Sequence, residues 1–369
     1  KLLSQDDQVS PSRVWIDPAS KELFAVEYEP GYPNYQFVDN ASPLTKRLKG
    51  FINAFSGQQV HLVSSTYDGK FNVVLATSDK NPGDYYLYNK KKNKLAYLFS
   101  AKSWIEPNDM AEVRPIEFTA RDGLQLTGYL TMPKGAKEKN LPLVVMPHGG
   151  PHDIRDWWRF NSEAQLLANR GIAVLQVNFR GSGGFGDAFE NSGYKKWGSL
   201  IQTDILDGVN HLVEQQIVDK NNMCIMGASF GGYSALQSSI IAPDMFKCAI
   251  GVVGIYDLPM MFSEGDIQRR DSGVRYLKTV LGSDEAQLKA FSPTQNIDKL
   301  KTPVLIVHGG EDERAPIEQA EELIESLDKH KHPYEYLLLE DEGHGFYKAK
   351  HQTKYLNKVL EFLDKHLVI

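Results

Sequence analysis

Short apolar runs alternate with amphipathic stretches along the C-terminal two-thirds of the chain. A short apolar run between turn signals is typical of a buried strand, and apolar positions three to four apart are typical of a helix. Their alternation indicates an α/β domain with a mostly parallel sheet covered by helices on both faces. We expect strands at residues 116–118, 124–130, 143–146, 172–177, 223–226, 249–253, 304–307 and 334–340. Helices are expected at residues 162–169, 199–215, 317–328 and 354–366 and from residue 230 onward, with short helices within residues 256–298.

Residues 1–110 follow a different pattern. Short strands are expected at residues 22–27, 60–65, 71–76, 85–88 and 95–99, with one helix at residues 44–55. Consecutive antiparallel strands resemble propeller blades, but this segment has material for only one or two, and a closed propeller needs four or more. Its sheet edges would need cover. We therefore expect a partial β-propeller-like segment at residues 1–110, a catalytic domain at residues 111–369, and a longer natural chain.

The motif Gly227-Ala228-Ser229-Phe230-Gly231 lies between a predicted strand and a predicted helix. In that context G-x-S-x-G is typical of a tight turn that lifts a serine hydroxyl clear of the sheet. The glycines permit the close backbone approach that the turn requires. A serine is a poor nucleophile unless a base removes its proton, so the motif predicts an acid and a histidine further along the chain.

Both partners follow in the expected order. Asp312 comes after a predicted buried strand, and His344 lies between two glycines after the next strand. The carboxyl ends of parallel strands share one edge of a sheet, where ligands and chemistry gather. The order Ser229, Asp312, His344 is that of the α/β-hydrolase triad. Asp257 also follows a predicted strand and remains a rival for the acid.

A turn of Pro147-His148-Gly149-Gly150-Pro151 ends another predicted strand. A glycine pair there can bring a backbone N–H close to a developing oxyanion, and the residue after the nucleophile supplies a second N–H. We therefore expect Gly150 and Phe230 to form an oxyanion hole.

Composition narrows the possible partners. The chain has 369 residues, 41% hydrophobic residues, 24% charged residues and a net charge of −6, which argues against nucleic acid as the main partner. No run of 18 apolar residues appears, so we expect no membrane span.

Cys224 and Cys248 lie in apolar strand-like runs and are predicted to be buried free thiols. The histidines lack the spacing of metal ligands, and we expect no metal. The chain begins with Lys1, so localisation stays open.

These motifs resemble those of the prolyl oligopeptidase family of serine peptidases, nearest its acylaminoacyl-peptidase-like branch. The resemblance covers residues 115–369 by specific motifs and residues 60–110 more loosely, as the last propeller blade. It implies an α/β-hydrolase fold, no cofactor, short peptide substrates, and acylated amino acids or dipeptides as products. By this likeness Ser229 is the nucleophile, Asp312 the orienting acid, His344 the base, Gly150 and Phe230 the oxyanion donors, and Arg314 a substrate-binding residue. The matching segments are residues 148–151, 178–182, 227–231, 308–316 and 343–346.

Several alternatives stay open. A carboxylesterase could use the same three residues, and a non-catalytic interaction module could retain them as a relic. The sequence leaves open the preference for a blocked or free N-terminus and a possible homo-oligomer.

Residues 181–186 fit G-x-G-x-x-G, but no apolar helix follows them. We therefore interpret this loop as part of the active-site wall, with Arg180 in a structural ion pair.

Overall fold

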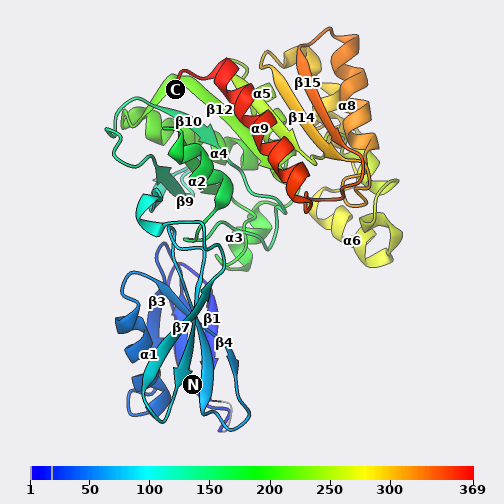
Figure 1. Cartoon of the computed structure of the whole chain (residues 1–369). Coiled ribbons are helices and arrows are strands. Elements are labelled where there is room, and N and C mark those ends of the chain that lie inside the picture. The colour runs from blue at the N-terminus through cyan, green and yellow to red at the C-terminus, as the bar shows by residue number, and fades with distance from the viewer. Residues whose placement is uncertain (1, 18–19) are drawn as a thin grey trace. The chain divides into compact units, whose positions relative to one another are not determined.

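The computed structural model describes residues 2–17 and 20–369 (Figure 1). It comprises two compact units. The first, here the N-terminal unit, consists of Lys1–Ile116, Tyr129–Ala136 and Trp157–Arg170. The second, the C-terminal unit, consists of Glu117–Gly128, Lys137–Asp156 and Gly171–Ile369.

An eight-stranded sheet in the order β15-β14-β13-β12-β10-β11-β9-β8 forms the framework of the α/β part. All five adjacent pairs from β15 to β11 are parallel, which confirms the predicted mostly parallel sheet. Its central strands are buried because helices such as α5 and α9 pack against them. The strands are β8 (Glu112–Thr119), β9 (Gln125–Met132), β10 (Leu141–Val145), β11 (Ala173–Asn178), β12 (Val218–Ala228), β13 (Cys248–Val252), β14 (Val304–Gly309) and β15 (Tyr334–Leu339).

The five helices predicted individually for residues 111–369 lie close to their expected positions, the expected short helices occupy residues 256–298, and α3 was not predicted. They are α2 (Ser162–Asn169), α3 (Asp187–Ser192), α4 (Leu200–Glu214), α5 (Phe230–Ile241), α6 (Asp271–Val280), α7 (Glu285–Ala290), α8 (Glu318–Lys329) and α9 (Ala349–His366). Short 3₁₀ helices are η1 (Pro107–Asp109), η2 (Pro259–Phe262), η3 (Ile267–Arg269), η4 (Pro293–Gln295) and η5 (Ile297–Lys299).

The N-terminal unit contains two small antiparallel sheets and one helix. The three-stranded sheet is β1 (Arg13–Ile16), β2 (Leu23–Tyr28) and β3 (Asn34–Phe37); the four-stranded sheet is β4 (Gln59–Ser65), β5 (Phe71–Thr77), β6 (Asp84–Asn89) and β7 (Lys94–Ser100). Strands β1 and β3 are absent from the sequence prediction because each is only four residues long. Helix α1 (Pro43–Ala54) begins where the Ser42 hydroxyl accepts the Leu44 N–H. The four-stranded meander has the strand number of one propeller blade.

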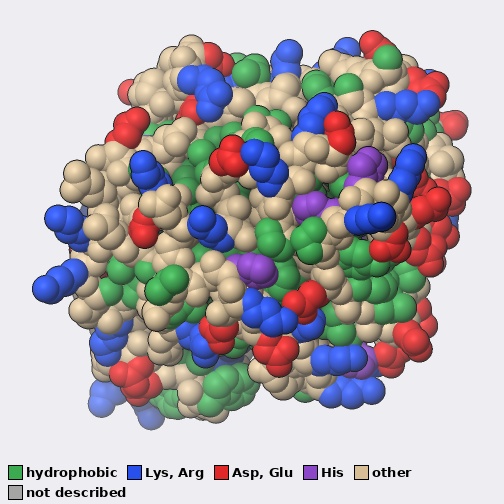
Figure 2. Space-filling model, turned by 90° about the horizontal axis from the view of Figure 1, so that it is seen from above, with side chains coloured by type: hydrophobic (Ala, Val, Ile, Leu, Met, Phe, Trp, Pro, Cys, Tyr) green, Lys and Arg blue, Asp and Glu red, His purple; other side chains and the backbone are tan. Residues whose placement is uncertain are grey.

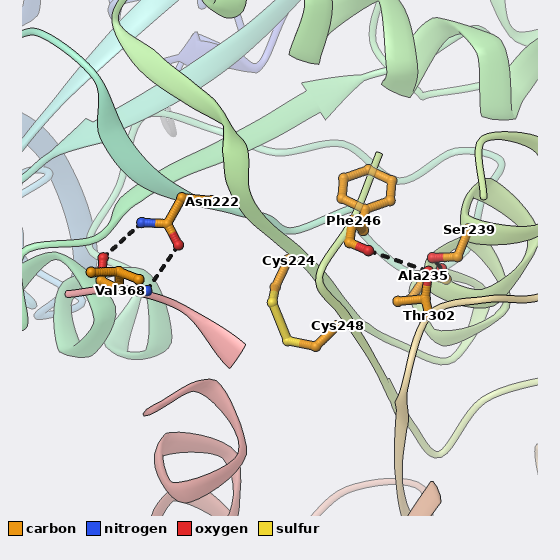
Figure 3. The surroundings of a disulfide bond; sticks show 8 residues. All are labelled: Asn222, Cys224, Ala235, Ser239, Phe246, Cys248, Thr302 and Val368. Carbon is orange, nitrogen blue, oxygen red and sulfur yellow. Dashed lines mark hydrogen bonds between the residues drawn. A yellow bond between two sulfur atoms is a disulfide. The ribbon is translucent and has the colours of Figure 1, made fainter. Parts of the chain in front are cut away.

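The two cysteines form a disulfide, so the prediction of free thiols is wrong (Figure 3). Strands β12 and β13 are parallel neighbours, and their register places Cys224 directly beside Cys248. The Cα atoms are 4.8 Å apart, within the range that a disulfide spans. An apolar run is equally compatible with a thiol and with a disulfide, and only the strand register distinguishes them.

The face of the molecule seen in Figure 2 carries acidic and basic side chains interspersed with small apolar patches. Within residues 2–17 and 20–369, no helix has the length and apolar character needed to cross a bilayer.

The disulfide is expected to stabilise the C-terminal unit. Closing a loop of 24 residues restricts the unfolded chain, so replacing both Cys224 and Cys248 by alanine should lower the free energy of unfolding by about 3 kcal/mol. Urea unfolding with and without a reductant measures this, and the double variant should be insensitive to the reductant. Two free thiols titrated in the denatured, unreduced protein would contradict the disulfide.

Candidate active site

Ser229 occupies a tight turn between β12 and α5. Its backbone has φ +59° and ψ −121°, in a region that side-chain-bearing residues rarely adopt. The flanking glycines make the turn possible: a Cβ at Gly227 would lie 2.5 Å from the Gly231 backbone, and a Cβ at Gly231 would clash with the Pro147 carbonyl oxygen. The Ser229 N–H donates to the Val252 carbonyl at 2.9 Å, which fixes the turn to the neighbouring strand.

Of the expected oxyanion donors, Phe230 directly follows Ser229 and Gly150 lies in a separate turn that lines the same cavity as Ser229. Phe230 is fully buried and is the first residue of α5, so its N–H is one of the groups that a helix leaves without an intrahelical partner. A Cβ at Gly149 would lie 3.6 Å from the Ser229 Cβ, which shows how closely the 147–151 turn approaches the serine. Gly150 has φ +113°, and it lines the same cavity as Ser229.

Asp312 and His344 are joined by a hydrogen bond. His344 Nδ1 donates to Asp312 Oδ2 at 2.8 Å, and Asp312 Oδ1 accepts the N–H groups of Arg314 and Ala315 at 2.9 Å each. The Asp312 side chain is buried, whereas that of His344 is 30% exposed. Because Nδ1 carries the hydrogen, Nε2 of the neutral ring is the acceptor that can take a proton. Ser229 and His344 line one cavity, so the structure brings all three predicted residues to one site.

The rival acid, Asp257, has different partners. Its Oδ1 accepts the Met260 N–H and its Oδ2 accepts the Thr294 hydroxyl, both at 3.0 Å. The first bond closes a local turn, and the second connects Asp257 to η4. The geometry therefore favours Asp312 over Asp257 as the partner of His344.

A second histidine lies close to Asp312. His308 is fully buried, and its Nε2 donates to the Ala315 carbonyl at 2.8 Å while lying 3.8 Å from Asp312 Oδ2. Burial lowers the pKa of His308 below its usual value, so it contributes a neutral donor to the loop after Asp312. Ala315 thus receives this bond at its carbonyl and gives its N–H to Asp312.

A cavity of about 970 Å³ opens beside Ser229. Arg314, predicted to bind substrate, lies on its wall with its guanidinium held by Asp266: Nε is 2.8 Å from Oδ1, and Nη2 donates to Oδ2 at 2.9 Å. The sequence analysis did not identify Asp266, because nothing near it in the sequence points to Arg314. The apolar part of the wall consists of Ile154, Trp197, Ile255, Met261, Ile267 and Tyr276.

His152 follows the oxyanion turn in the chain and lines the same cavity as Ser229. It is buried, and the Trp197 indole N–H donates to its Nε2 at 3.1 Å. This bond requires the unprotonated ring nitrogen. Burial lowers the pKa of His152 to about 4, so the ring is neutral at physiological pH. His148 also joins the turn to its surroundings, since its Nε2 lies 2.9 Å from the Ser182 hydroxyl.

The glycine-rich loop at residues 181–186 packs against the backbone at Asp153. A Cβ at Gly183 would lie 2.7 Å from the Asp153 backbone, so the loop fits closely beside the oxyanion turn. The expected ion pair of Arg180 is present: its Nη2 donates to Asp204 Oδ1 at 2.7 Å, and a second carboxylate, Asp122, lies 2.8 Å from Nη1. Among residues 2–17 and 20–369, no group of three histidine, cysteine, aspartate or glutamate side chains is placed to hold a metal ion.

Comparison with known proteins gives concordant matches. The model of the prolyl oligopeptidase family matches residues 158–368. Dipeptidyl aminopeptidase BIII of Pseudoxanthomonas mexicana is 31% identical over 383 residues, covering 98% of this chain and 53% of that protein. The acylamino-acid-releasing enzyme of Homo sapiens is 29% identical over 257 residues, covering 66% of this chain and 34% of that protein.

Solved structures share the fold. A puromycin-hydrolyzing peptidase of Mycobacterium tuberculosis superposes with a TM-score of 0.79 at 24% identity, covering 97% of this chain and 54% of that one. Acylaminoacyl peptidase of Pyrococcus horikoshii gives a TM-score of 0.77 at 22% identity, with 98% and 56% covered. The chain spans about half the length of the curated relatives that match it over nearly its whole length.

The two candidate acids can be separated by labelling Ser229 with a fluorophosphonate, which requires an activated serine. Asp312→Asn should slow labelling by roughly 10³- to 10⁴-fold, because the imidazole loses its orienting acceptor. Asp257→Asn, the matched control, should change the rate less than about threefold. The reverse ranking would assign the acid to Asp257, and labelling that persists in Ser229→Ala would contradict the nucleophile.

Stability should fall in acid because His152 is buried in its neutral form. Its pKa is about 4 in the folded protein and 6.5 ordinarily, so the unfolded chain binds the proton more tightly between these values. The contribution is complete above about pH 6.5 and is lost as the pH falls toward 4, by up to about 3 kcal/mol. Urea unfolding across pH 4–7 measures this. His152→Gln, which keeps an acceptor for Trp197, should reduce the slope by about one proton; an unchanged slope would contradict the assignment.

Proposed function

Because the chain belongs to the prolyl oligopeptidase family of serine peptidases, we propose that it hydrolyses short peptides through an acyl-enzyme formed on Ser229. One observation carries the proposal: His344, oriented by Asp312 at 2.8 Å, lines the same cavity as Ser229. We assign this chemistry to residues 111–369.

The reaction proceeds in two acyl transfers. Ser229 Oγ attacks the scissile carbonyl carbon while His344 Nε2 takes its proton, and the C–N bond then breaks as His344 protonates the leaving amine. A water molecule gives its proton to His344 and attacks the ester, and the proton returns to Ser229 Oγ as the acid is released. Asp312 keeps the hydrogen on His344 Nδ1 and stabilises the imidazolium that forms in each half-reaction.

The oxyanion of each tetrahedral intermediate needs fixed donors. We assign this role to the backbone N–H groups of Phe230 and Gly150. The Phe230 N–H is supported by its place at the first position of α5, where the helix dipole also favours negative charge. Gly150 is supported by its position on the cavity wall and by the close approach of the preceding Gly149 to Ser229.

The cavity suits a peptide with an apolar side chain beside the scissile bond. Its apolar wall can bury such a side chain, while Arg314 keeps guanidinium donors that can bind a substrate carbonyl oxygen. Asp266 orients the guanidinium and offsets its charge.

We further propose that the product is a dipeptide released from a free N-terminus. Two relatives that match 98–100% of this chain are named dipeptidyl aminopeptidase and dipeptidyl peptidase. The acylamino-acid-releasing enzymes match only 66% of this chain. Sequence likeness that includes the N-terminal unit therefore favours dipeptide release over release of acylated amino acids, although the fold is shared with an acylaminoacyl peptidase.

Three substrates distinguish the candidates: a free dipeptidyl nitroanilide with an apolar second residue, an N-acetylated aminoacyl nitroanilide and a nitrophenyl ester, with Ser229→Ala as the blank. We expect serine-dependent cleavage of both the dipeptidyl anilide and the ester, with kcat/KM for the dipeptidyl anilide at least tenfold above that for the acetylated one. A preference for the acetylated anilide would reverse the assigned product. Cleavage of the ester alone would support the carboxylesterase alternative, because an amide leaving group depends more on protonation than an ester does.

A further inference from the structure

The loop that carries His344 is organised around a buried carboxylate. Glu342 is only 4% exposed, although it lies on a surface loop. Its Oε2 accepts the Tyr347 N–H at 3.1 Å, and its Oε1 accepts the Lys348 N–H at 3.0 Å and the His351 Nδ1 hydrogen at 2.8 Å. One side chain thus binds the chain on the far side of His344 and the first turn of α9.

Glu342 also connects the loop of His344 to the loop of Asp312. Its carbonyl accepts the Glu311 N–H at 2.9 Å, one residue before Asp312. A Cβ at Gly309 would clash with the carbonyl oxygens of Glu342 and Gly343, so the two loops interlock where the glycine leaves room. Glu342 therefore binds the loop of Asp312 through its backbone carbonyl and the start of α9 through its side chain.

His344 itself has few restraints. Its ring is 30% exposed, and its Nδ1 donates a hydrogen bond to Asp312. It lies between Gly343 and Gly345, and Gly345 has φ +154°, so the adjacent backbone resists rotation weakly. The position of the imidazole must then come from bonds made by neighbouring residues, of which those of Glu342 span the whole loop.

We propose that Glu342 is a positioning residue that holds His344 against Asp312 and toward Ser229. The inference rests on the proposed function, because it assumes that His344 is the base. The contacts are charge-assisted, which makes them stronger than neutral hydrogen bonds. Lost hydration acts to raise the pKa of Glu342, but the N–H groups of Tyr347 and Lys348 and the His351 ring outweigh it and keep the pKa below its usual value.

The test compares two carboxylates that are adjacent in the sequence. Glu342→Gln removes the buried charge and replaces one acceptor by an amide group that cannot accept from a backbone N–H. Asp341→Asn makes the same chemical change one residue earlier, where the side chain is 51% exposed, pairs with Lys348 at the surface and lies 3.5 Å from His351 Nε2. Both variants are measured for fluorophosphonate labelling of Ser229 across pH, for kcat and KM on the dipeptidyl anilide, and for stability by urea unfolding.

We expect Glu342→Gln to lower the labelling rate and kcat by about 10- to 100-fold, as is typical of groups that orient a reactive side chain, with KM changed less than about threefold. Asp341→Asn should match the parent in all three. The proton of the His344–Asp312 hydrogen bond should also lose its downfield NMR signal in Glu342→Gln, which a merely less stable protein would retain while folded.

Parental labelling and kcat in folded Glu342→Gln would overturn the proposal, and so would a rise in KM alone. If Glu342→Gln does not fold, His351→Gln weakens one bond to Glu342 and should slow labelling about threefold to tenfold; a parental rate would then overturn it. A parent protein that is not labelled at Ser229 would instead remove the proposed function, and this inference with it.

Discussion

The geometry of the site depends on one steric constraint, the close packing of backbone on backbone around Ser229. The serine holds a left-handed conformation that costs of order 1–3 kcal/mol and persists only where the surroundings enforce it. Gly227 and Gly231 permit this packing, because a Cβ at either position would clash with neighbouring backbone. The same packing brings the Pro147–Gly150 turn against the start of α5, where an oxyanion would be stabilised.

Two buried histidines contribute hydrogen bonds next to this arrangement. His152 accepts the Trp197 indole hydrogen next to the oxyanion turn, and His308 donates to the Ala315 carbonyl in the loop after Asp312. Burial lowers the pKa of both rings, which favours their neutral forms.

Three carboxylates at the site differ in their partners. Asp312 accepts from His344 and from two backbone N–H groups, Asp266 pairs with Arg314 at the cavity wall, and Glu342 accepts hydrogen bonds from the segment that follows His344. Each lies on a loop at the carboxyl edge of the sheet, where a parallel sheet brings distant segments together. The cavity wall combines an apolar part with the charged side chains of Asp266, Glu311, Glu313 and Arg314, so both shape and polar contacts can position a substrate.

The sequence by itself determined the order of strands and helices and the candidate Ser229, Asp312 and His344. These follow from local rules: apolar periodicity defines the elements, and the G-x-S-x-G turn is a short-range steric solution. Tertiary structure alone decided that Cys224 pairs with Cys248, that Asp312 rather than Asp257 reaches His344, and that Asp266 holds Arg314. Those pairings depend on strand register and on which loops converge, and residues 24 to 48 positions apart in the chain carry no local signal of their contact.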